Sequence, residues 1–225
     1  GRRVDRQNAL FEESVHSLCT RLRLSRELRQ IQVLGISSAV SDEGKTILAT
    51  QLAMALEKSL KRRILLIDAD MRSPDVCRIF EISTEPGLAQ VLSRESDYES
   101  VINTSFSDTL HLMPAGRLAA SPHSLLGSEL FTEMIDELRE QYDFIIIDAP
   151  PLLSSSEALV LAAAADANLL CARRNFSRTA QIREAYQRLF EADANPIGVV
   201  LNGVPHSAYA AHYGRYSAVE EPVYS

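Results

Sequence analysis

Three neighbouring residues, Gly44, Lys45 and Thr46, stand between a short apolar run and a helical pattern. This is the context of a phosphate-binding loop, in which backbone N–H groups at the start of a helix converge on phosphate oxygens. The Lys45 ammonium group would reach the terminal phosphates, and the Thr46 hydroxyl would join the shell of a Mg²⁺ ion. A bare Gly-Lys-Thr also occurs in ordinary surface turns, so this interpretation depends on the strand and helix that flank it.

The residues before this triad depart from the usual pattern G-x-x-x-x-G-K-[ST]. Ala39 occupies the position of the first glycine, and Asp42 places a negative charge inside a cradle built for anions. We therefore expect nucleotide binding of modest affinity.

A second motif, ILLIDADMR, ends a predicted strand with two carboxylates, Asp68 and Asp70. Residues two apart in a strand point to the same face, so the two negative charges repel each other. Leaving them unpaired in a partly buried crevice is costly, and a bound cation or Arg72 is the natural compensation. The alternative is that one carboxylate caps the following turn while the other pairs with an arginine.

The third motif, FIIIDAPP, ends another apolar run in Asp148. A carboxylate at this place can hold Mg²⁺ or its water, as in the Walker B strand of nucleotide-binding proteins. The motif is weak alone. It gains weight because it follows the phosphate loop along the chain and because ligands of α/β sheets bind at the carboxyl ends of the strands.

Short apolar runs alternate with helical patterns along the chain, which predicts a doubly wound, mostly parallel α/β sheet with right-handed crossovers. An amphipathic helix is expected over 11–28. The predicted strands are 31–37, 64–68, 110–113, 144–148, 167–171 and 197–202. The predicted helices are 46–60, 88–92, 130–141, 156–165 and 179–192. We divide the chain into an N-terminal helix and linker (1–30), one P-loop domain (31–204) and a tail (205–225).

The composition excludes several classes of protein. A net charge of -7 gives no broad positive field for nucleic acid, so no nucleic-acid partner is expected. Three cysteines without metal-ligand spacing indicate buried thiols in a reducing compartment. No apolar run reaches the roughly 18 to 20 residues of a membrane span. We expect a cytoplasmic protein, held at the inner face of the membrane by a partner or by a segment outside this sequence.

The tail beyond residue 204 is rich in tyrosine and poor in apolar periodicity, so we expect it to be mobile. Four of the seven tyrosines of the chain lie there. They are Tyr209, Tyr213, Tyr216 and Tyr224. Such a cluster could dock on a partner or pack locally, and it could also accept phosphate.

Together these motifs resemble the bacterial tyrosine kinase (BY-kinase) family of capsule and exopolysaccharide assembly, over roughly residue 12 to the C-terminus. The residues that carry the resemblance are EGKT (43–46), LLIDADMRSP (65–74), GLAQVL (87–92), MPAGRLAASPHSLL (113–126), FIIIDAPP (144–151), GVVLN (198–202) and the tyrosine-rich tail. The resemblance implies a P-loop NTPase fold of the deviant Walker A type, similar to MinD and ParA.

By this resemblance the cofactors are ATP and Mg²⁺, and the protein is a tyrosine autokinase. The implied catalytic residues are Lys45, Asp68, Asp70, Asp148 and Arg72, with Asp70 as the candidate base. The implied nucleotide contacts are Asp42, Glu43, Gly44, Lys45, Thr46, Ile47 and Asn202. The implied metal ligands are Thr46, Asp68 and Asp148, and the implied phosphoacceptors are Tyr209, Tyr213, Tyr216 and Tyr224 of a neighbouring subunit.

The resemblance also implies partners. They are a transmembrane polysaccharide co-polymerase or adaptor, fused or separate, further copies of the chain in a homo-oligomer, and a tyrosine phosphatase as antagonist.

Two features depart from the family pattern. The N-terminal helix of the family carries E-x-x-R-x-x-R as an oligomer contact, and the matching residues here are Glu13, His16 and Cys19, so both arginines are missing. Arg21 or Arg23 could stand in for them. The family also reads P-G before E-G-K, where this chain has Ser41 and Asp42.

Two other functions remain as alternatives. A partitioning or cell-division ATPase works as a nucleotide switch, but such proteins carry an extra lysine five residues before the P-loop lysine, where this chain has Val40. A weakly active nucleotide-binding scaffold on a membrane partner fits the altered phosphate loop. ATP binding without phosphorylation of the tail would identify it.

Overall fold

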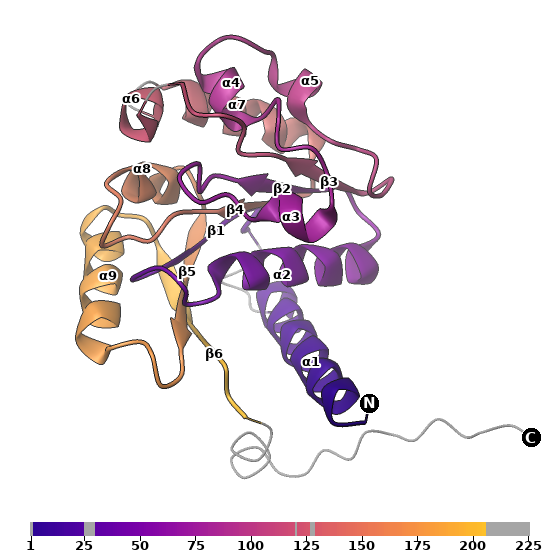
Figure 1. Cartoon of the computed structure of the whole chain (residues 1–225), viewed down its shortest axis with the longest axis vertical. Helices are drawn as coiled ribbons and strands as arrows, with labels where there is room; N and C mark the ends of the chain where they lie inside the picture. Colours follow the sequence, from indigo (N-terminus) through magenta and orange to yellow (C-terminus); the bar gives the residue numbers. More distant parts are fainter. Residues whose placement is uncertain (1, 25–29, 120, 127–128, 206–225) are drawn as a thin grey trace, which may run out of the picture.

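Six parallel strands form one sheet in the order β3-β2-β4-β1-β5-β6 (Figure 1). The computed structural model describes residues 2–24, 30–119, 121–126 and 129–205. The strands are β1 (Val33–Ser38), β2 (Ile64–Asp68), β3 (Leu110–Met113), β4 (Phe144–Asp148), β5 (Ala167–Arg173) and β6 (Pro196–Asn202). All residues of β1 to β4 are buried, because helices cover both faces of the sheet.

Helices lie on both sides of the sheet, as a doubly wound fold requires (Figure 1). One face packs against α1 (Arg2–Leu24), α2 (Lys45–Leu60) and α3 (Val76–Phe80). The other face packs against α4 (Leu88–Leu92), α5 (Tyr98–Val101), α6 (Pro122–Leu126), α7 (Leu130–Gln141) and α8 (Glu157–Ala163). A smaller core joins α8 to α9 (Thr179–Glu191) and β5. The predicted fold class is confirmed, and the sheet is parallel throughout.

The register of the central strands brings the acidic motifs together. In the pairing of β2 with β4, Asp68 lies opposite Asp148 at the carboxyl ends of both strands. In the pairing of β1 with β4, Ile36 lies opposite Asp148, so the loop after β1 begins beside the same carboxylate. The phosphate loop and both acidic motifs therefore share one edge of the sheet.

The predicted elements agree with the observed ones to within a few residues, with one larger difference and three omissions. The N-terminal helix was expected over 11–28, whereas α1 begins at Arg2 and ends at Leu24. The short helices α3, α5 and α6 were not predicted.

The face of α1 that packs on the core carries Val15, Cys19 and Leu22. Cys19 occupies the third position of the family's oligomer motif and is buried, so an arginine there would have to bury its charge. His16, at the second position, is exposed. Arg21 is exposed and available for an oligomer contact, whereas the side chain of Arg23 lies outside the described structure.

Three further expectations can be compared with the structure. Cys19, Cys77 and Cys171 are all buried, as predicted. Within the described ranges, no helix is both long and apolar enough to cross a bilayer. The tail tyrosines lie in 206–225, outside the described residues, so their role stays a prediction, as does the division of the chain at residues 30 and 204.

Candidate active site

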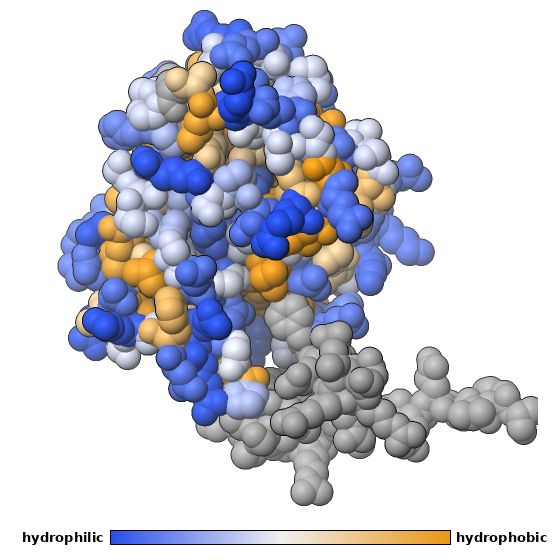
Figure 2. Space-filling view, viewed as in Figure 1, coloured by the Kyte–Doolittle hydropathy of each residue, from blue (hydrophilic) through white to orange (hydrophobic). Residues whose placement is uncertain are grey.

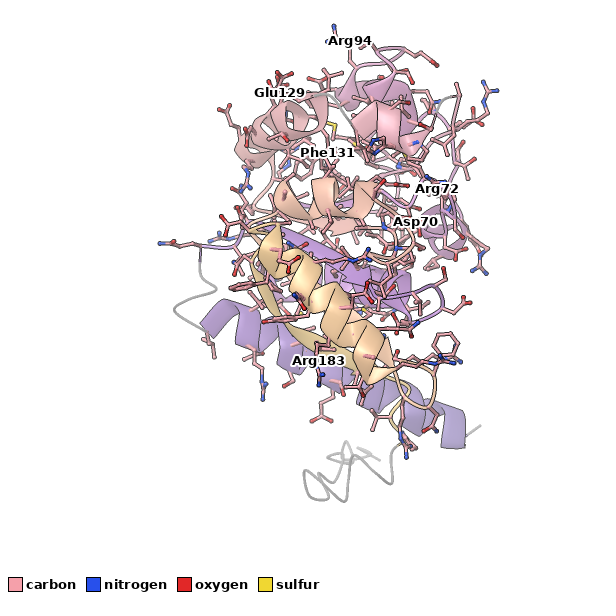
Figure 3. The ribbon with its side chains drawn as sticks, turned by 90° about the vertical axis from the view of Figure 1, so that its left-hand side faces the viewer. Asp70, Arg72, Arg94, Glu129, Phe131 and Arg183 are labelled. Carbon is pink, nitrogen blue, oxygen red and sulfur yellow. The ribbon has the colours of Figure 1, made fainter. Side chains whose placement is uncertain are left out.

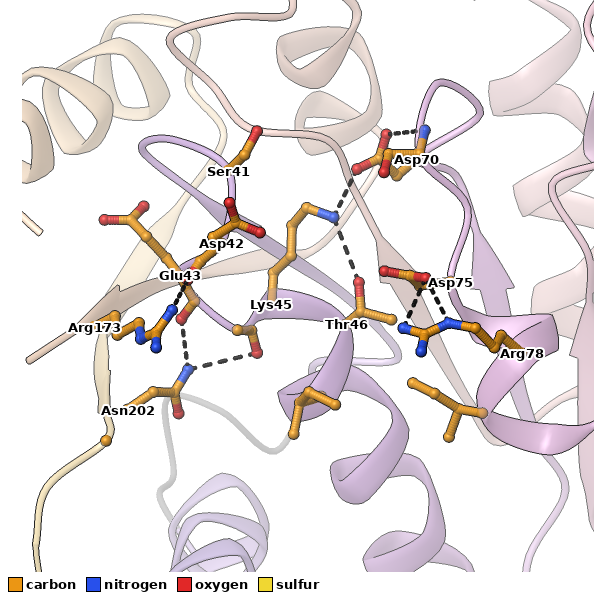
Figure 4. A pocket seen from close by; sticks show the side chains of 15 residues that line it. Ser41, Asp42, Glu43, Lys45, Thr46, Asp70, Asp75, Arg78, Arg173 and Asn202 are labelled. Carbon is orange, nitrogen blue, oxygen red and sulfur yellow. Dashed lines mark hydrogen bonds and ion pairs between the residues drawn. The ribbon is translucent and has the colours of Figure 1, made fainter. Parts of the chain in front are cut away.

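A cavity of about 470 Å³ opens at the carboxyl ends of the strands, above the start of α2 (Figure 4). Five segments line it: the phosphate loop (41–47), the loop after β2, helix α3, the end of β5 and the end of β6. The lining residues outside the phosphate loop are Asp70, Ser73, Asp75, Arg78, Ile79, Arg173, Asn202 and Gly203. A cavity of this size at this edge of a doubly wound sheet fits a nucleotide.

Gly44 forms the cap of α2 with a φ of 89°, in the left-handed region. A Cβ atom at this position would lie 2.7 Å from Nδ2 of Asn202, so the backbone angle favours glycine and any larger residue would have to displace the Asn202 side chain. The α2 N-terminus behind it presents backbone N–H groups toward the cavity. The expected phosphate cradle is therefore formed by the local backbone.

Lys45 joins the phosphate loop to the acidic motifs (Figure 4). Its Nζ lies 2.6 Å from Oδ2 of Asp70 and 4.0 Å from Oδ1 of Asp148, and it donates to the Thr46 hydroxyl at 3.4 Å. Burial alone would lower the pKa of Lys45, but the negative charges of Asp148 and Asp70 raise it. Lys45 therefore stays fully charged as the one cation that faces this acidic cluster in the described structure.

Asp68 and Asp148 are fully buried and poorly satisfied. Asp68 accepts one hydrogen bond, from the Val76 backbone N–H at 3.1 Å, while its Oδ1 and both oxygens of Asp148 have no hydrogen-bond partner. The pKa of Asp68 is raised to about 8, mainly because the carboxyl group is buried and also because the negative charge of Asp148 lies close to it. Burial also raises the pKa of Asp148 to about 6, although the Lys45 charge opposes the rise.

These orphaned oxygens fit a hard divalent cation. Three buried carboxylate oxygens of Asp68 and Asp148 have no hydrogen-bond partner, and oxygen ligands of this kind are those that Mg²⁺ prefers. The described residues hold no group of three or more His, Cys, Asp or Glu arranged as a complete metal cage. Mg²⁺ commonly uses only one or two carboxylates and takes its remaining ligands from water and substrate phosphates.

The pairing expected for Arg72 is wrong. Its Nε donates to Oε1 of Glu157 at 2.6 Å, and Lys45 instead provides the compensating charge for Asp70. Asp70 also caps the following turn by accepting the Ser73 N–H at 3.2 Å, as the alternative interpretation expected for one of the two carboxylates. Arg72 lies close to Asp70 (Figure 3), although it is not among the residues that line the cavity.

Glu157 is a site residue that the sequence did not reveal. It is 2% exposed and begins α8, and its Oε2 has no hydrogen-bond partner. It holds Arg72 through Nε alone, and neither terminal nitrogen of the guanidinium makes a hydrogen bond or ion pair within the described ranges. Eighty-five residues separate the two partners, so no local pattern could have joined them.

Glu43 and Asn202 hold the phosphate loop in place. The buried Glu43 carboxylate accepts the Val40 N–H at 2.8 Å and the Ser177 hydroxyl. Asn202 donates its Nδ2 to the Glu43 carbonyl oxygen at 2.9 Å. Both residues were expected to contact nucleotide, and in this structure their side chains support the loop backbone. Ile47 lines the cavity and is half exposed, so its side chain is free to contact a ligand.

Asp42 has a φ of 64°, in the left-handed region where glycine is favoured and where Asp and Asn are tolerated. This is the position at which the family pattern has glycine. We expect Asp42→Asn and Asp42→Gly to tighten ATP binding to a similar extent, about three- to tenfold, because both remove a negative charge beside the phosphates. Titration with a fluorescent ATP analogue measures this effect. A gain with glycine alone would show that the backbone angle, and not the charge, weakens binding.

The buried carboxylates predict that stability falls with rising pH. The native pKa of Asp68 lies near 8, far above its ordinary value, so the folded protein keeps a proton that the unfolded chain loses. Folding is therefore coupled to proton uptake, and each such proton weakens stability by up to about 1.4 kcal/mol per pH unit between pH 4 and 8. Urea unfolding without Mg²⁺ should show this slope. Asp68→Asn should flatten it, and an equal slope in the variant would refute this assignment.

Comparison with known proteins places these features in a family. Residues 32–182 match the family described as AAA domain. The chain is 30% identical to the tyrosine-protein kinase YwqD of Bacillus subtilis over 208 aligned residues. The alignment covers 92% of this chain and 87% of YwqD. It is also 30% identical over 200 residues to the tyrosine-protein kinase etk of Escherichia coli, covering 89% of this chain.

The chain spans 27% of the length of etk and 27% of the tyrosine-protein kinase ptk of Acinetobacter johnsonii. The solved kinase domain of Escherichia coli ETK superposes with a TM-score of 0.81 at 28% identity, covering 95% of this chain and 80% of that domain. On the strength of the match to YwqD over nearly its full length, the chain belongs to the bacterial tyrosine-protein kinase family.

Proposed function

We propose that this protein is an ATP-dependent tyrosine autokinase that transfers the γ-phosphoryl group of ATP to tail tyrosines of a neighbouring copy. The observation that carries the proposal is the position of Lys45, which contacts Asp70 at 2.6 Å and Asp148 at 4.0 Å at the mouth of the cavity. One lysine thus joins the phosphate loop to both acidic motifs. Family membership supports the same activity.

The side chains divide the chemistry between them. The α2 N-terminus and Lys45 would hold the phosphates and neutralise the charge that develops on the transferred group. Thr46, Asp68 and Asp148 would hold Mg²⁺, which when bound neutralises charge on the phosphate oxygens. Arg72, fixed by Glu157, would present its two free terminal nitrogens to an anion at the rim.

Asp70 is the proposed base. A tyrosine phenol has a pKa of about 10 and is mostly protonated at neutral pH. In the proposed step the phenolic oxygen bonds to the γ-phosphorus, the bond to the bridging oxygen of ADP breaks, and the phenolic proton passes to Asp70. The Asp70 carboxylate is 4% exposed at the cavity wall, which keeps it within reach of a hydroxyl that enters the site.

The partners belong to the same proposal. A membrane-spanning polysaccharide co-polymerase or adaptor would hold the kinase at the cytoplasmic face of the membrane, where it would regulate capsule or exopolysaccharide assembly. Copies of the chain would form a homo-oligomer in which one tail reaches the neighbouring site. A tyrosine phosphatase would reverse the modification. Each tail phosphate adds about -1.5 to -2 charges to an acidic chain, so repulsion would loosen the assembly.

A mixing experiment tests the transfer between copies. One chain carries Phe in place of Tyr209, Tyr213, Tyr216 and Tyr224, so that it can act only as enzyme. A second chain carries Lys45→Met, so that it can act only as substrate. After incubation with Mg²⁺ and ATP, we expect peptide mass spectrometry to find phosphate on the tail of the second chain.

The separate chains are the controls, and neither should acquire tail phosphate alone. Unmodified tails in the mixture and in the wild-type protein, together with measurable ATP binding, would reject the kinase and leave the nucleotide-binding scaffold. ATP hydrolysis without tail phosphate would favour the nucleotide-switch ATPase.

A further inference from the structure

The turn between β5 and α9 carries arginines that form no ion pair with any carboxylate in the described part of the chain. Residues 173–178, here called the arginine turn, read RRNFSR and contain Arg173, Arg174 and Arg178. All three are exposed, and none forms an ion pair within the described ranges, although seven other basic residues do. In a chain with a net charge of -7, this is a local reversal of sign.

The same turn exposes an aromatic ring. Phe176 is 48% exposed, and the guanidinium carbon of Arg173 lies 5.6 Å from the centre of its ring. In the space-filling view, hydrophilic side chains gather at the end of the molecule where β5 passes into α9 (Figure 2). Arginine beside an exposed aromatic ring is a combination that recurs where proteins bind other chains.

The arginine turn is firmly attached to the active site. The Ser177 hydroxyl accepts the Arg173 N–H at 2.7 Å and donates to the buried Glu43 of the phosphate loop. Arg173 donates from its guanidinium to the Asp42 carbonyl oxygen at 3.3 Å, and the Arg174 N–H donates to the Asn202 carbonyl oxygen at 2.9 Å. A chain bound to this turn would lie beside the mouth of the cavity.

We propose that the arginine turn is the docking site for the acidic end of the tail of a neighbouring copy, and that it directs Tyr224 into the active site first. This inference rests on the proposed function. We identify the end of the tail as the partner of the arginine turn by its charge, since Glu220 and Glu221 are the only acidic residues of 206–225. Tyr224 follows Glu221 by three residues, a reach of about 10 Å in an extended chain.

The other tail tyrosines lack this feature. Tyr216 lies four residues before Glu220, but it follows Arg215 directly, and the arginine turn would repel that charge. Tyr209 and Tyr213 have no acidic residue within six positions. Docking through Arg174 and Arg178 would therefore discriminate among four chemically identical acceptors.

A charge-swap experiment tests the docking. Arg174→Glu with Arg178→Glu reverses two charges and spares Arg173, which lines the nucleotide cavity. In the mixing assay, we expect this enzyme to show about a tenfold higher KM for the Lys45→Met substrate chain, with little change in kcat or in ATP affinity. Tyr224 should also lose its lead over the other sites in a time course.

The reciprocal change should restore the reaction. A substrate chain with Glu220→Lys and Glu221→Lys should have a high KM with the unaltered enzyme. Its KM should fall again with the enzyme that carries the reversed turn. Lys58→Glu with Arg94→Glu is the matched control, since both residues are exposed and unpaired within the described ranges. Figure 3 shows Arg94 at the opposite end of the molecule from Arg183 of α9. The control enzyme should keep its KM.

A binding measurement separates this inference from the kinase itself. A fluorescein-labelled peptide of residues 206–225 is titrated with each protein and followed by anisotropy, without ATP. Docking is supported if the wild-type peptide binds more weakly to the protein with the reversed turn and the Glu220→Lys, Glu221→Lys peptide restores binding. This conclusion holds even if no phosphate is ever transferred. Equal binding and equal KM for wild-type and reversed turns would overturn the docking site while leaving the kinase proposal intact.

Discussion

Lys45→Met is expected to reduce phosphoryl transfer to the tail by at least about 10²–10³-fold, because it removes a positive charge that faces both Asp70 and Asp148. Methionine has nearly the same length, so the packing of the stem is kept while the charge is lost. The measurement is phosphate incorporation per chain under single-turnover conditions, read by intact-protein mass spectrometry. Transfer at more than a tenth of the wild-type rate would contradict the role assigned to Lys45.

Stability has to be separated from catalysis in this variant. Lys45 is nearly buried, and leaving Asp70 without its cation costs on the order of 3 kcal/mol. The double variant Lys45→Met with Asp70→Asn removes both partners and should recover much of that loss in urea unfolding. It should remain inactive. Recovery of activity together with stability would show that Lys45 serves folding and not phosphoryl transfer.

Most of the sheet could be predicted from the sequence because its strands are buried on both faces. Runs such as 64–68 and 144–148 have no polar face, so each reads as a continuous apolar segment, and the predicted bounds of β2 and β4 are those observed. Each run ends in the aspartate that enters the site. In both runs, the last residue of the apolar segment therefore predicted both the end of the strand and the candidate functional residue.

The parts of the site that were missed depend on contacts between distant segments. Arg72 with Glu157, and Glu43 with Ser177, join residues that lie more than eighty positions apart, and only the folded sheet brings them together. Arg173 was missed for a related reason: it lines the cavity from the end of β5, a strand that carries no motif. The sequence motifs predicted the residues that are proposed for the chemistry, but not those that support and flank them.

The departures in the phosphate loop also have a structural account. Ala39 is buried in the small core beneath α8 and α9, so its methyl group packs against protein and does not obstruct the phosphate cradle. Asp42 is different, since its carboxylate is exposed at the cavity. Of the two substitutions, only Asp42 is in a position to weaken nucleotide binding.

Asp148→Asn is expected to change activity and stability in opposite directions. The side chain is fully buried and neither oxygen has a hydrogen-bond partner, so in the absence of Mg²⁺ its charge repels Asp68 and is offset only in part by Lys45 at 4.0 Å. Removing that charge should stabilise the Mg²⁺-free protein by about 1 kcal/mol or more at pH 8, since one pKa unit corresponds to about 1.4 kcal/mol. The pKa of Asp68 should fall as well, because Asp148 contributes to its rise.

Catalysis should respond the other way. Asparagine offers a neutral oxygen to Mg²⁺, so we expect kcat to fall about 10²-fold or more and the Mg²⁺ concentration for half-maximal rate to rise. Urea unfolding with and without Mg²⁺, beside a Mg²⁺ titration of tail phosphorylation, measures both effects. Asp136→Asn, at an exposed site on α7, is the matched control and should change neither. Parallel losses of stability and activity in Asp148→Asn would mean that this carboxylate supports the fold, and its assignment as a ligand for Mg²⁺ would then be wrong.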